Sequence, residues 1–246
     1  MQFEGADFDA KQVLARQPGI ETLTLYNIRK KDMGRIQGLA ELPLKHLEIR
    51  WLSAPDLTDV PLPGTLDTFM LWHSRTKSLA GVERARNLTG LNLSENSTLE
   101  DMTALAALPG LRRLSIVGGF NGGQKITTFE PLRGLQITEL ELAAIDGAQL
   151  DLGPVATLPL ETVDIWGRSF APAELAKVCR AFPVYYQDLL RLKDYSLDGM
   201  RCPKCDGRRK EMFLRGKNFL WCPDCQHRGL AKVLADFDAL VQDIGS

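Results

Sequence analysis

Four of the five cysteines stand in two Cys-x-x-Cys pairs near the C-terminal end of this 246-residue chain. Cys202 and Cys205 form the first pair, Cys222 and Cys225 form the second, and sixteen residues separate the pairs. Each pair can place two thiolates on one tight turn, and two facing turns complete a tetrahedral shell of four sulfurs. The spacing therefore predicts a metal site rather than a disulfide framework, which would distribute more cysteines over a smaller chain.

The segment between the pairs has to bring them together. Residues 212–221, MFLRGKNFLW, predict a β-hairpin with two apolar strands and a turn at 215–218. With a proline after the first cysteine of each pair, the segment resembles a zinc ribbon, which implies structural Zn²⁺; a rubredoxin-like iron site and a redox dithiol pair are the alternatives. Four thiolates leave no open position for water, so we expect the metal to stabilise a small module rather than to catalyse. His227 could replace a ligand, but an exposed histidine is the favoured interpretation.

A repeat dominates the first two thirds of the chain. Leu88–Asn96 fits the pattern L-x-x-L-x-L-x-x-N, and seven segments align on it at spacings of 22 to 26 residues. They start at Ile20, Leu44, Leu66, Leu88, Leu111, Ile137 and Leu160. The pattern resembles the leucine-rich repeat family, in its short bacterial, internalin-like form. The resemblance implies an α/β solenoid with one parallel strand per repeat on a concave face and short 3₁₀ or helical returns.

Four regions are expected from these patterns. We expect residues 1–19 to form an N-terminal cap that contains a short helix, with Asp9 as the residue that caps its first turn. We expect residues 20–198 to form the solenoid, with a closing helical segment from Ala171. Residues 199–229 predict the zinc ribbon, and 230–246 predict an amphipathic helix that covers the open end of the solenoid or meets a partner. Cys179, the fifth cysteine, lies on or beside the apolar face of the closing helix and is interpreted as a small buried side chain.

The outward side chains of the repeats indicate a binding surface. In each repeat, the residues that flank the middle leucines point away from the core. The candidates for partner binding are Tyr26, His46, Glu48, Arg50, Trp51, Met70, Trp72, His73, Arg113, Glu139, Glu141, Asp164, Trp166 and Arg168. Tryptophan, tyrosine, methionine and arginine are enriched where proteins bind proteins. We therefore expect this surface to recognise a protein partner.

No catalytic motif is recognisable, so we expect no enzymatic activity. His46 and His73 lie near Glu48 and Asp67, and a general acid–base pair is conceivable there, but a polar binding surface is favoured.

The expected function is that of a bacterial scaffold, regulator or inhibitor that binds a protein. The alternative is nucleic-acid binding, because residues 201–232 carry nine Lys and Arg against three Asp and Glu. The candidate phosphate contacts are Arg208, Arg209, Lys210, Arg215 and Lys217. The acidic start of the chain does not resemble a secretory signal, and eighteen apolar residues never run together, so the cytoplasm is the expected location.

Overall fold

The computed structural model describes residues 1–119, 123–166, 169–190, 193–194, 201–207, 210–211, 220–222 and 224–243. The chain forms two compact units. The first contains residues 1–146 and 158–165, and the second contains residues 147–157 and 166–246.

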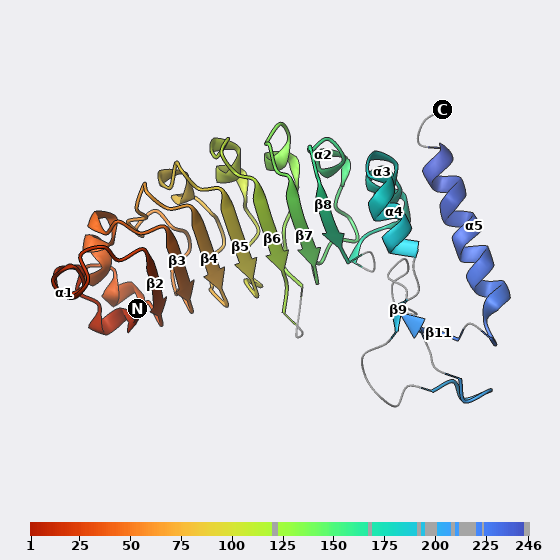
Figure 1. Ribbon diagram of the computed structural model, residues 1–246, viewed down its shortest axis with the longest axis horizontal. Coiled ribbons are helices and arrows are strands. Elements are labelled where there is room, and N and C mark those ends of the chain that lie inside the picture. The colour runs from red at the N-terminus through yellow and green to blue at the C-terminus, as the bar shows by residue number, and fades with distance from the viewer. Residues whose placement is uncertain are drawn as a thin grey trace. The chain divides into compact units, whose positions relative to one another are not determined.

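The first unit is built on an open sheet of eight parallel strands, whose order in the sheet is their order in the chain (Figure 1). The strands are β1 (Gln2–Glu4), β2 (Thr22–Tyr26), β3 (His46–Arg50), β4 (Thr68–Trp72), β5 (Gly90–Ser94), β6 (Arg113–Val117), β7 (Glu139–Ala143) and β8 (Thr162–Ile165). The seven aligned segments each contain one of these strands, which confirms the predicted parallel arrangement. The short first strand was not predicted; it pairs with β2 along Gln2–Glu4.

Period-two alternation sets the two faces of the sheet. In β5, for example, Leu91 and Leu93 are buried, whereas Asn92 and Ser94 are partly exposed on the other face. Short helical segments return the chain between strands. They are η1 (Gly5–Asp7), α1 (Ala10–Arg16), η2 (Lys30–Asp32), η3 (Arg35–Glu41), η4 (Val82–Arg84), η5 (Thr103–Ala107) and η6 (Glu130–Leu132). The predicted cap of α1 is confirmed, because the Asp9 carboxylate accepts hydrogen bonds from the backbone N–H groups of Lys11 and Gln12.

Buried polar side chains bond the backbone where the strands turn into the returns. Asn96 is fully buried; its Oδ1 accepts from the N–H of Ser74 at 2.9 Å, and its Nδ2 donates to the carbonyl of Leu71 at 2.8 Å. One repeat further on, Gln124 makes a similar bond, from Nε2 to the carbonyl of Leu93 at 2.7 Å. The asparagine of the repeat motif therefore has a structural role, and in the next repeat a glutamine substitutes for part of it.

Five repeats leave the sheet through a left-handed residue. These residues are Asn27 (φ 53°), Trp51 (φ 56°), His73 (φ 50°), Glu95 (φ 56°) and Ala144 (φ 49°). The N–H groups of the first four extend the sheet ladder; for example, Trp51 donates to the carbonyl of Trp72 at 3.0 Å. Left-handed backbone costs an L-residue about 1–2 kcal/mol, and asparagine tolerates it better than bulky residues do. The turn is thus imposed by the repeat and not by the side chain that occupies it.

The second unit combines four helices with a small antiparallel sheet in its described part. The helices are α2 (Gly153–Ala156), α3 (Pro172–Ala181), α4 (Pro183–Leu190) and α5 (His227–Asp243), and the strands are β9 (Lys193–Asp194), β10 (Lys210–Glu211) and β11 (Leu220–Trp221). Strand β10 pairs with both β9 and β11. The pairing of β10 with β11 fits the base of the predicted hairpin, whose residues 212–219 lie outside the described residues. The additional strand β9 was not predicted.

Helix α5 begins at His227, three residues before the predicted start at Leu230, and packs against α3. Its buried Phe237 lies 6.1 Å from the ring of Tyr186 on α4. Cys179 of α3 is buried, as expected, and burial raises the pKa of its thiol to about 12. Such a thiol stays protonated at neutral pH and acts as a small apolar side chain.

We expect the Asn96→Ala substitution to lower the free energy of unfolding by about 2–4 kcal/mol, because it leaves the buried N–H of Ser74 without a partner and removes the amide bond to the carbonyl of Leu71. Asn92→Ala, the same substitution at a partly exposed position of β5, should change the free energy of unfolding by about 0.5 kcal/mol or less. Urea unfolding measures both. Equal losses in the two variants would contradict the structural role of Asn96.

Candidate functional site

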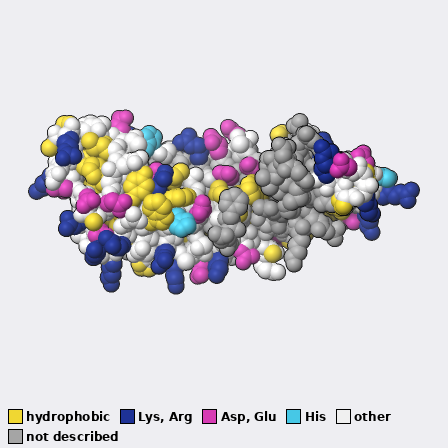
Figure 2. Space-filling view, turned by 90° about the horizontal axis from the view of Figure 1, so that it is seen from below, with side chains coloured by type: hydrophobic (Ala, Val, Ile, Leu, Met, Phe, Trp, Pro, Cys, Tyr) yellow, Lys and Arg dark blue, Asp and Glu magenta, His cyan; other side chains and the backbone are white. Residues whose placement is uncertain are grey.

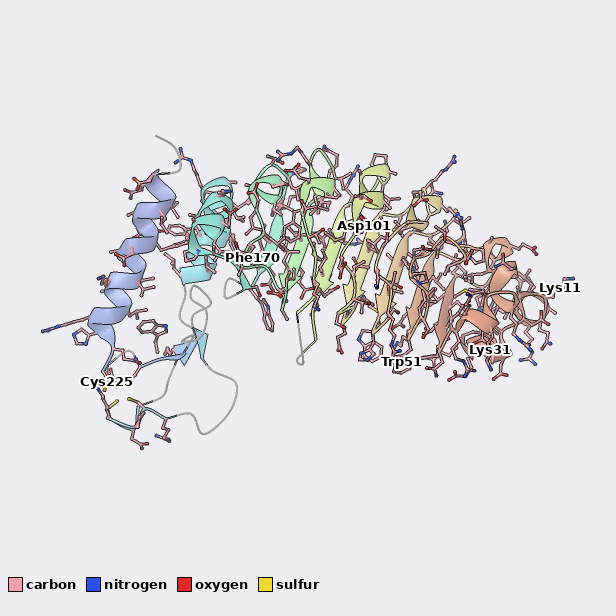
Figure 3. The ribbon with its side chains drawn as sticks, turned by 180° about the vertical axis from the view of Figure 1, so that it is seen from behind. Lys11, Lys31, Trp51, Asp101, Phe170 and Cys225 are labelled. Carbon is pink, nitrogen blue, oxygen red and sulfur yellow. The ribbon has the colours of Figure 1, made fainter. Side chains whose placement is uncertain are left out.

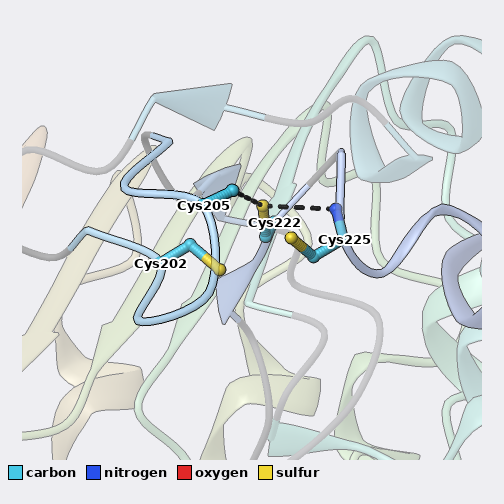
Figure 4. A group of neighbouring side chains, drawn as sticks. All are labelled: Cys202, Cys205, Cys222 and Cys225. Atoms are coloured by element: carbon cyan, nitrogen blue, oxygen red, sulfur yellow. Dashed lines mark hydrogen bonds between the residues drawn. The ribbon is translucent and has the colours of Figure 1, made fainter.

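The four cysteines of the two predicted pairs come together. Their sulfur atoms all lie within 4.8 Å of one another. Figure 4 shows the four side chains together. Cys202 and Cys222 are buried, whereas Cys205 and Cys225 are exposed. Four converging sulfurs could hold a metal ion, as the sequence predicts.

Two turns present these sulfurs. In the first, the N–H of Cys202 donates to the carbonyl of Gly207 and the N–H of Asp206 donates back to the carbonyl of Cys202, each at 2.9 Å. In the second, the side chain of Gln226 accepts from the N–H of Cys222 at 2.8 Å, and the chain then enters α5. The second turn thus connects the cysteine cluster directly to α5.

The close approach of four cysteine sulfurs favours the binding of a cation. Backbone N–H groups of Lys204 and Cys205 lower the pKa of the Cys202 thiol to about 6. In contrast, the hydrogen bond with Cys205 is the main cause that raises the pKa of the exposed Cys225 thiol to about 12. Sulfurs this close repel one another as thiolates, so all four ionise together only when a metal supplies compensating positive charge.

His227 lies outside the sulfur cluster. It is exposed, and its Nδ1 lies 3.1 Å from the carbonyl oxygen of Asp224. This agrees with the interpretation of an exposed histidine beside the second pair rather than a ligand.

We expect the purified wild type to contain about one metal ion per chain and Cys222→Ser to lose most of it, because the substitution removes a buried member of a four-ligand shell. Inductively coupled plasma mass spectrometry measures the metal content of both. Cys179→Ala removes a cysteine outside the cluster and should keep the metal. Full metal retention by Cys222→Ser would refute the site.

A second group of predicted residues meets on the exposed face of the sheet. Tyr26, Arg50 and Trp72 are lateral neighbours on β2, β3 and β4. The Arg50 guanidinium lies between the rings, with its Cζ 5.4 Å from the centre of Tyr26 and 5.1 Å from that of Trp72. Glu48 accepts a hydrogen bond from Arg50 Nε at 2.5 Å, which raises the pKa of the guanidinium. The arginine is therefore held in place as a cation.

Trp51 completes this group, which we call the aromatic cluster: Tyr26, Arg50, Trp51 and Trp72. The ring of Trp51 lies 5.9 Å from Tyr26 and packs edge-on against Trp72 at 5.2 Å. Figure 3 shows Trp51 at the edge where the strands end, and Figure 2 looks onto this edge, where hydrophobic side chains gather beside basic ones and a histidine. Trp51 is 38 % exposed, and its outer surface is open to a partner.

The middle of the exposed face is hollowed. A cavity of about 510 Å³, which we call the face hollow, runs across β2 to β8. Seven predicted residues line it: His46, Glu48, Met70, Arg113, Glu139, Glu141 and Asp164. Gly90 was not among the predicted site residues, yet a Cβ there would lie 3.3 Å from the guanidinium of Arg113 on the neighbouring strand. Gly90 thus makes room for Arg113 to lie across the sheet.

A separate hollow of about 680 Å³, the edge hollow, follows the ends of the strands. Trp51 and His73 line it. The alternation of the sequence had placed both on the outward strand face; this placement needs correction, because each lies one residue beyond its strand, in a left-handed turn that redirects the side chain to the edge. His73 Nδ1 lies 3.2 Å from Glu95 Oε2, and His46 Nδ1 lies 2.7 Å from Thr68 Oγ1.

The remaining predicted residues cannot be added to this face. Trp166 belongs to the second compact unit. Lys210 lies on β10, also in the second unit, and is partly buried. Arg168, Arg208, Arg209, Arg215 and Lys217 lie outside the described residues.

No protein-family model matches the chain, and no curated protein matches it. Within the described residues, every helix is too short or too polar to cross a lipid bilayer.

Proposed function

We propose that this chain is a non-enzymatic, cytoplasmic recognition protein. In this proposal, a leucine-rich repeat solenoid binds a partner protein on its concave face, and a C-terminal zinc ribbon holds a structural Zn²⁺ through Cys202, Cys205, Cys222 and Cys225. The protein would act as a scaffold, a regulator or an inhibitor of that partner.

The solenoid is supported by the sheet. Parallel strands follow one another in chain order, and the aligned segments that contain β2 to β8 recur every 22 to 26 residues. Their inward side chains stack in register, as Leu47, Phe69 and Leu91 do on β3 to β5. The buried amide of Asn96 supports the return, as the repeat motif requires.

Zinc is favoured by the donor set. Four sulfurs within 4.8 Å fit a tetrahedral thiolate shell, which zinc and iron both accept. A redox dithiol would need only one of the two pairs. The metal analysis above identifies the element as well as its amount, and iron in place of zinc would overturn this part of the proposal.

Recognition is supported above all by Trp51. Its backbone is left-handed at φ 56°, and its side chain is 38 % exposed. The equivalent residue of the first repeat is Asn27, which suits that conformation better. Strained, exposed aromatic residues cluster at functional sites, and tryptophan is enriched where binding energy concentrates. Stability alone therefore does not account for a tryptophan at this position.

We expect Trp51→Asn to keep the free energy of unfolding within about 1 kcal/mol of the wild type, because relief of backbone strain offsets the lost contacts with Tyr26 and Trp72. The same variant should lose the partner that the wild type captures from a lysate. Val184→Asn is the matched control, because Val184 is 82 % exposed on α4. Unchanged capture by Trp51→Asn would reject Trp51 as a binding residue.

A second prediction addresses the face itself. Asn92→Arg places a long side chain in the middle of the face hollow and should abolish capture by steric exclusion. Ala107→Arg makes a similar addition at an exposed position of η5 and should leave capture intact. Mass spectrometry of the captured proteins compares the two. Capture that survives Asn92→Arg would overturn recognition by this face.

Nucleic-acid binding is the alternative proposal, and of the five basic residues that suggest it the structure describes Lys210. The exposed ring of Trp51 supports a protein partner.

A further inference from the structure

The face hollow has an excess of negative charge. Its lining contains the carboxylates of Glu48, Glu139, Glu141 and Asp164 against the guanidinium of Arg113. Among these, Glu48 is paired with Arg50, and Glu139 is exposed on the face. A concave surface lined mainly by one sign of charge concentrates ligands of the opposite sign and repels those of the same sign.

The aromatic cluster shows which cation this face accepts. Two rings and a carboxylate already hold one guanidinium: Arg50 lies between Tyr26 and Trp72 and is bonded to Glu48. Arginine is suited to such sites because its planar group stacks on rings and bonds carboxylates at the same time. The exposed ring of Trp51 offers a further surface of the same kind next to this group. The aromatic and acidic parts of the face therefore select the same ligand chemistry.

We propose that the exposed face of the sheet binds an arginine- and lysine-rich segment of the partner protein. The carboxylates of the face hollow would pair with its cations, and Trp51 would stack on a guanidinium. An apolar segment would desolvate these carboxylates without pairing them, and an acidic segment or a nucleic acid would be repelled. This inference rests on the proposed function and adds the chemistry of the partner.

The test uses a fluorescein-labelled peptide of nine arginines and measures its binding to the full chain by fluorescence anisotropy. We expect the wild type to bind, and the double variant Glu139→Lys/Glu141→Lys to raise the Kd about tenfold or more, because two attractive charges become repulsive. The matched control is Asp59→Lys/Glu100→Lys, which makes the same change in net charge at exposed residues outside the strands. It should raise the Kd by about threefold or less, since distant exposed charges are screened by salt.

Two outcomes overturn the proposal: no peptide binding by the wild type, or equal weakening in the face variant and the control. If the charge reversal impairs folding, as judged by circular dichroism, Glu139→Gln/Glu141→Gln replaces it. This neutral pair should still weaken binding by about threefold or more relative to Asp59→Asn/Glu100→Gln.

The capture experiment with Asn92→Arg separates this inference from the proposed function. If Asn92→Arg abolishes capture of the partner while the peptide fails to respond to Glu139 and Glu141, the partner is not basic and recognition by the face still stands. If capture also survives Asn92→Arg, recognition by the face fails.

Discussion

The lateral register of the parallel sheet is the constraint on which the first unit depends. Leu47 of β3 lies beside Phe69 of β4, which lies beside Leu91 of β5, so the buried side chains form continuous rows across the strands. A slip of one residue would move each of these side chains to the exposed face and bury the polar ones, at a cost of several kcal/mol per strand. The near-constant spacing of the aligned segments in the sequence reflects this need to keep buried side chains in register.

The same register determines the proposed binding face. Because inward residues are aligned between strands, the outward ones are aligned as well, and Tyr26, Arg50 and Trp72 become neighbours although more than twenty residues separate them in the chain. The repeat also fixes the left-handed turn after the strands, which holds Trp51 at the edge. The cluster is thus ordered by the backbone before any partner arrives, so little side-chain entropy is lost on binding.

Much of this structure could be predicted from the sequence, because leucine periodicity and paired cysteines report directly on burial and on sulfur ligation. The strands from β2 to β8, the Asp9 cap, the role of Asn96 and the convergence of the cysteines all follow from such signals. Other features could not be predicted. Strand β1 is too short to show a period, and alternation does not reveal where a strand ends, so Trp51 and His73 were placed on the wrong side of the strand terminus. Gly90 seemed uninformative because its role depends on Arg113, a residue of the next repeat.

Each interior strand of the sheet, from β2 to β7, bonds to the strand before it and the strand after it in the chain. The pairing of two neighbouring strands therefore closes a chain segment of similar, moderate length in almost every case. The entropic cost of closing one such segment does not depend on whether distant repeats have folded. Folding of the sheet can therefore nucleate at any interior pair of strands and proceed toward both ends by the addition of one neighbouring strand at a time. A destabilised repeat would stop the addition of further strands at that point, while the strands already paired would stay folded. Folding intermediates with some repeats ordered and the others unfolded should therefore be detectable.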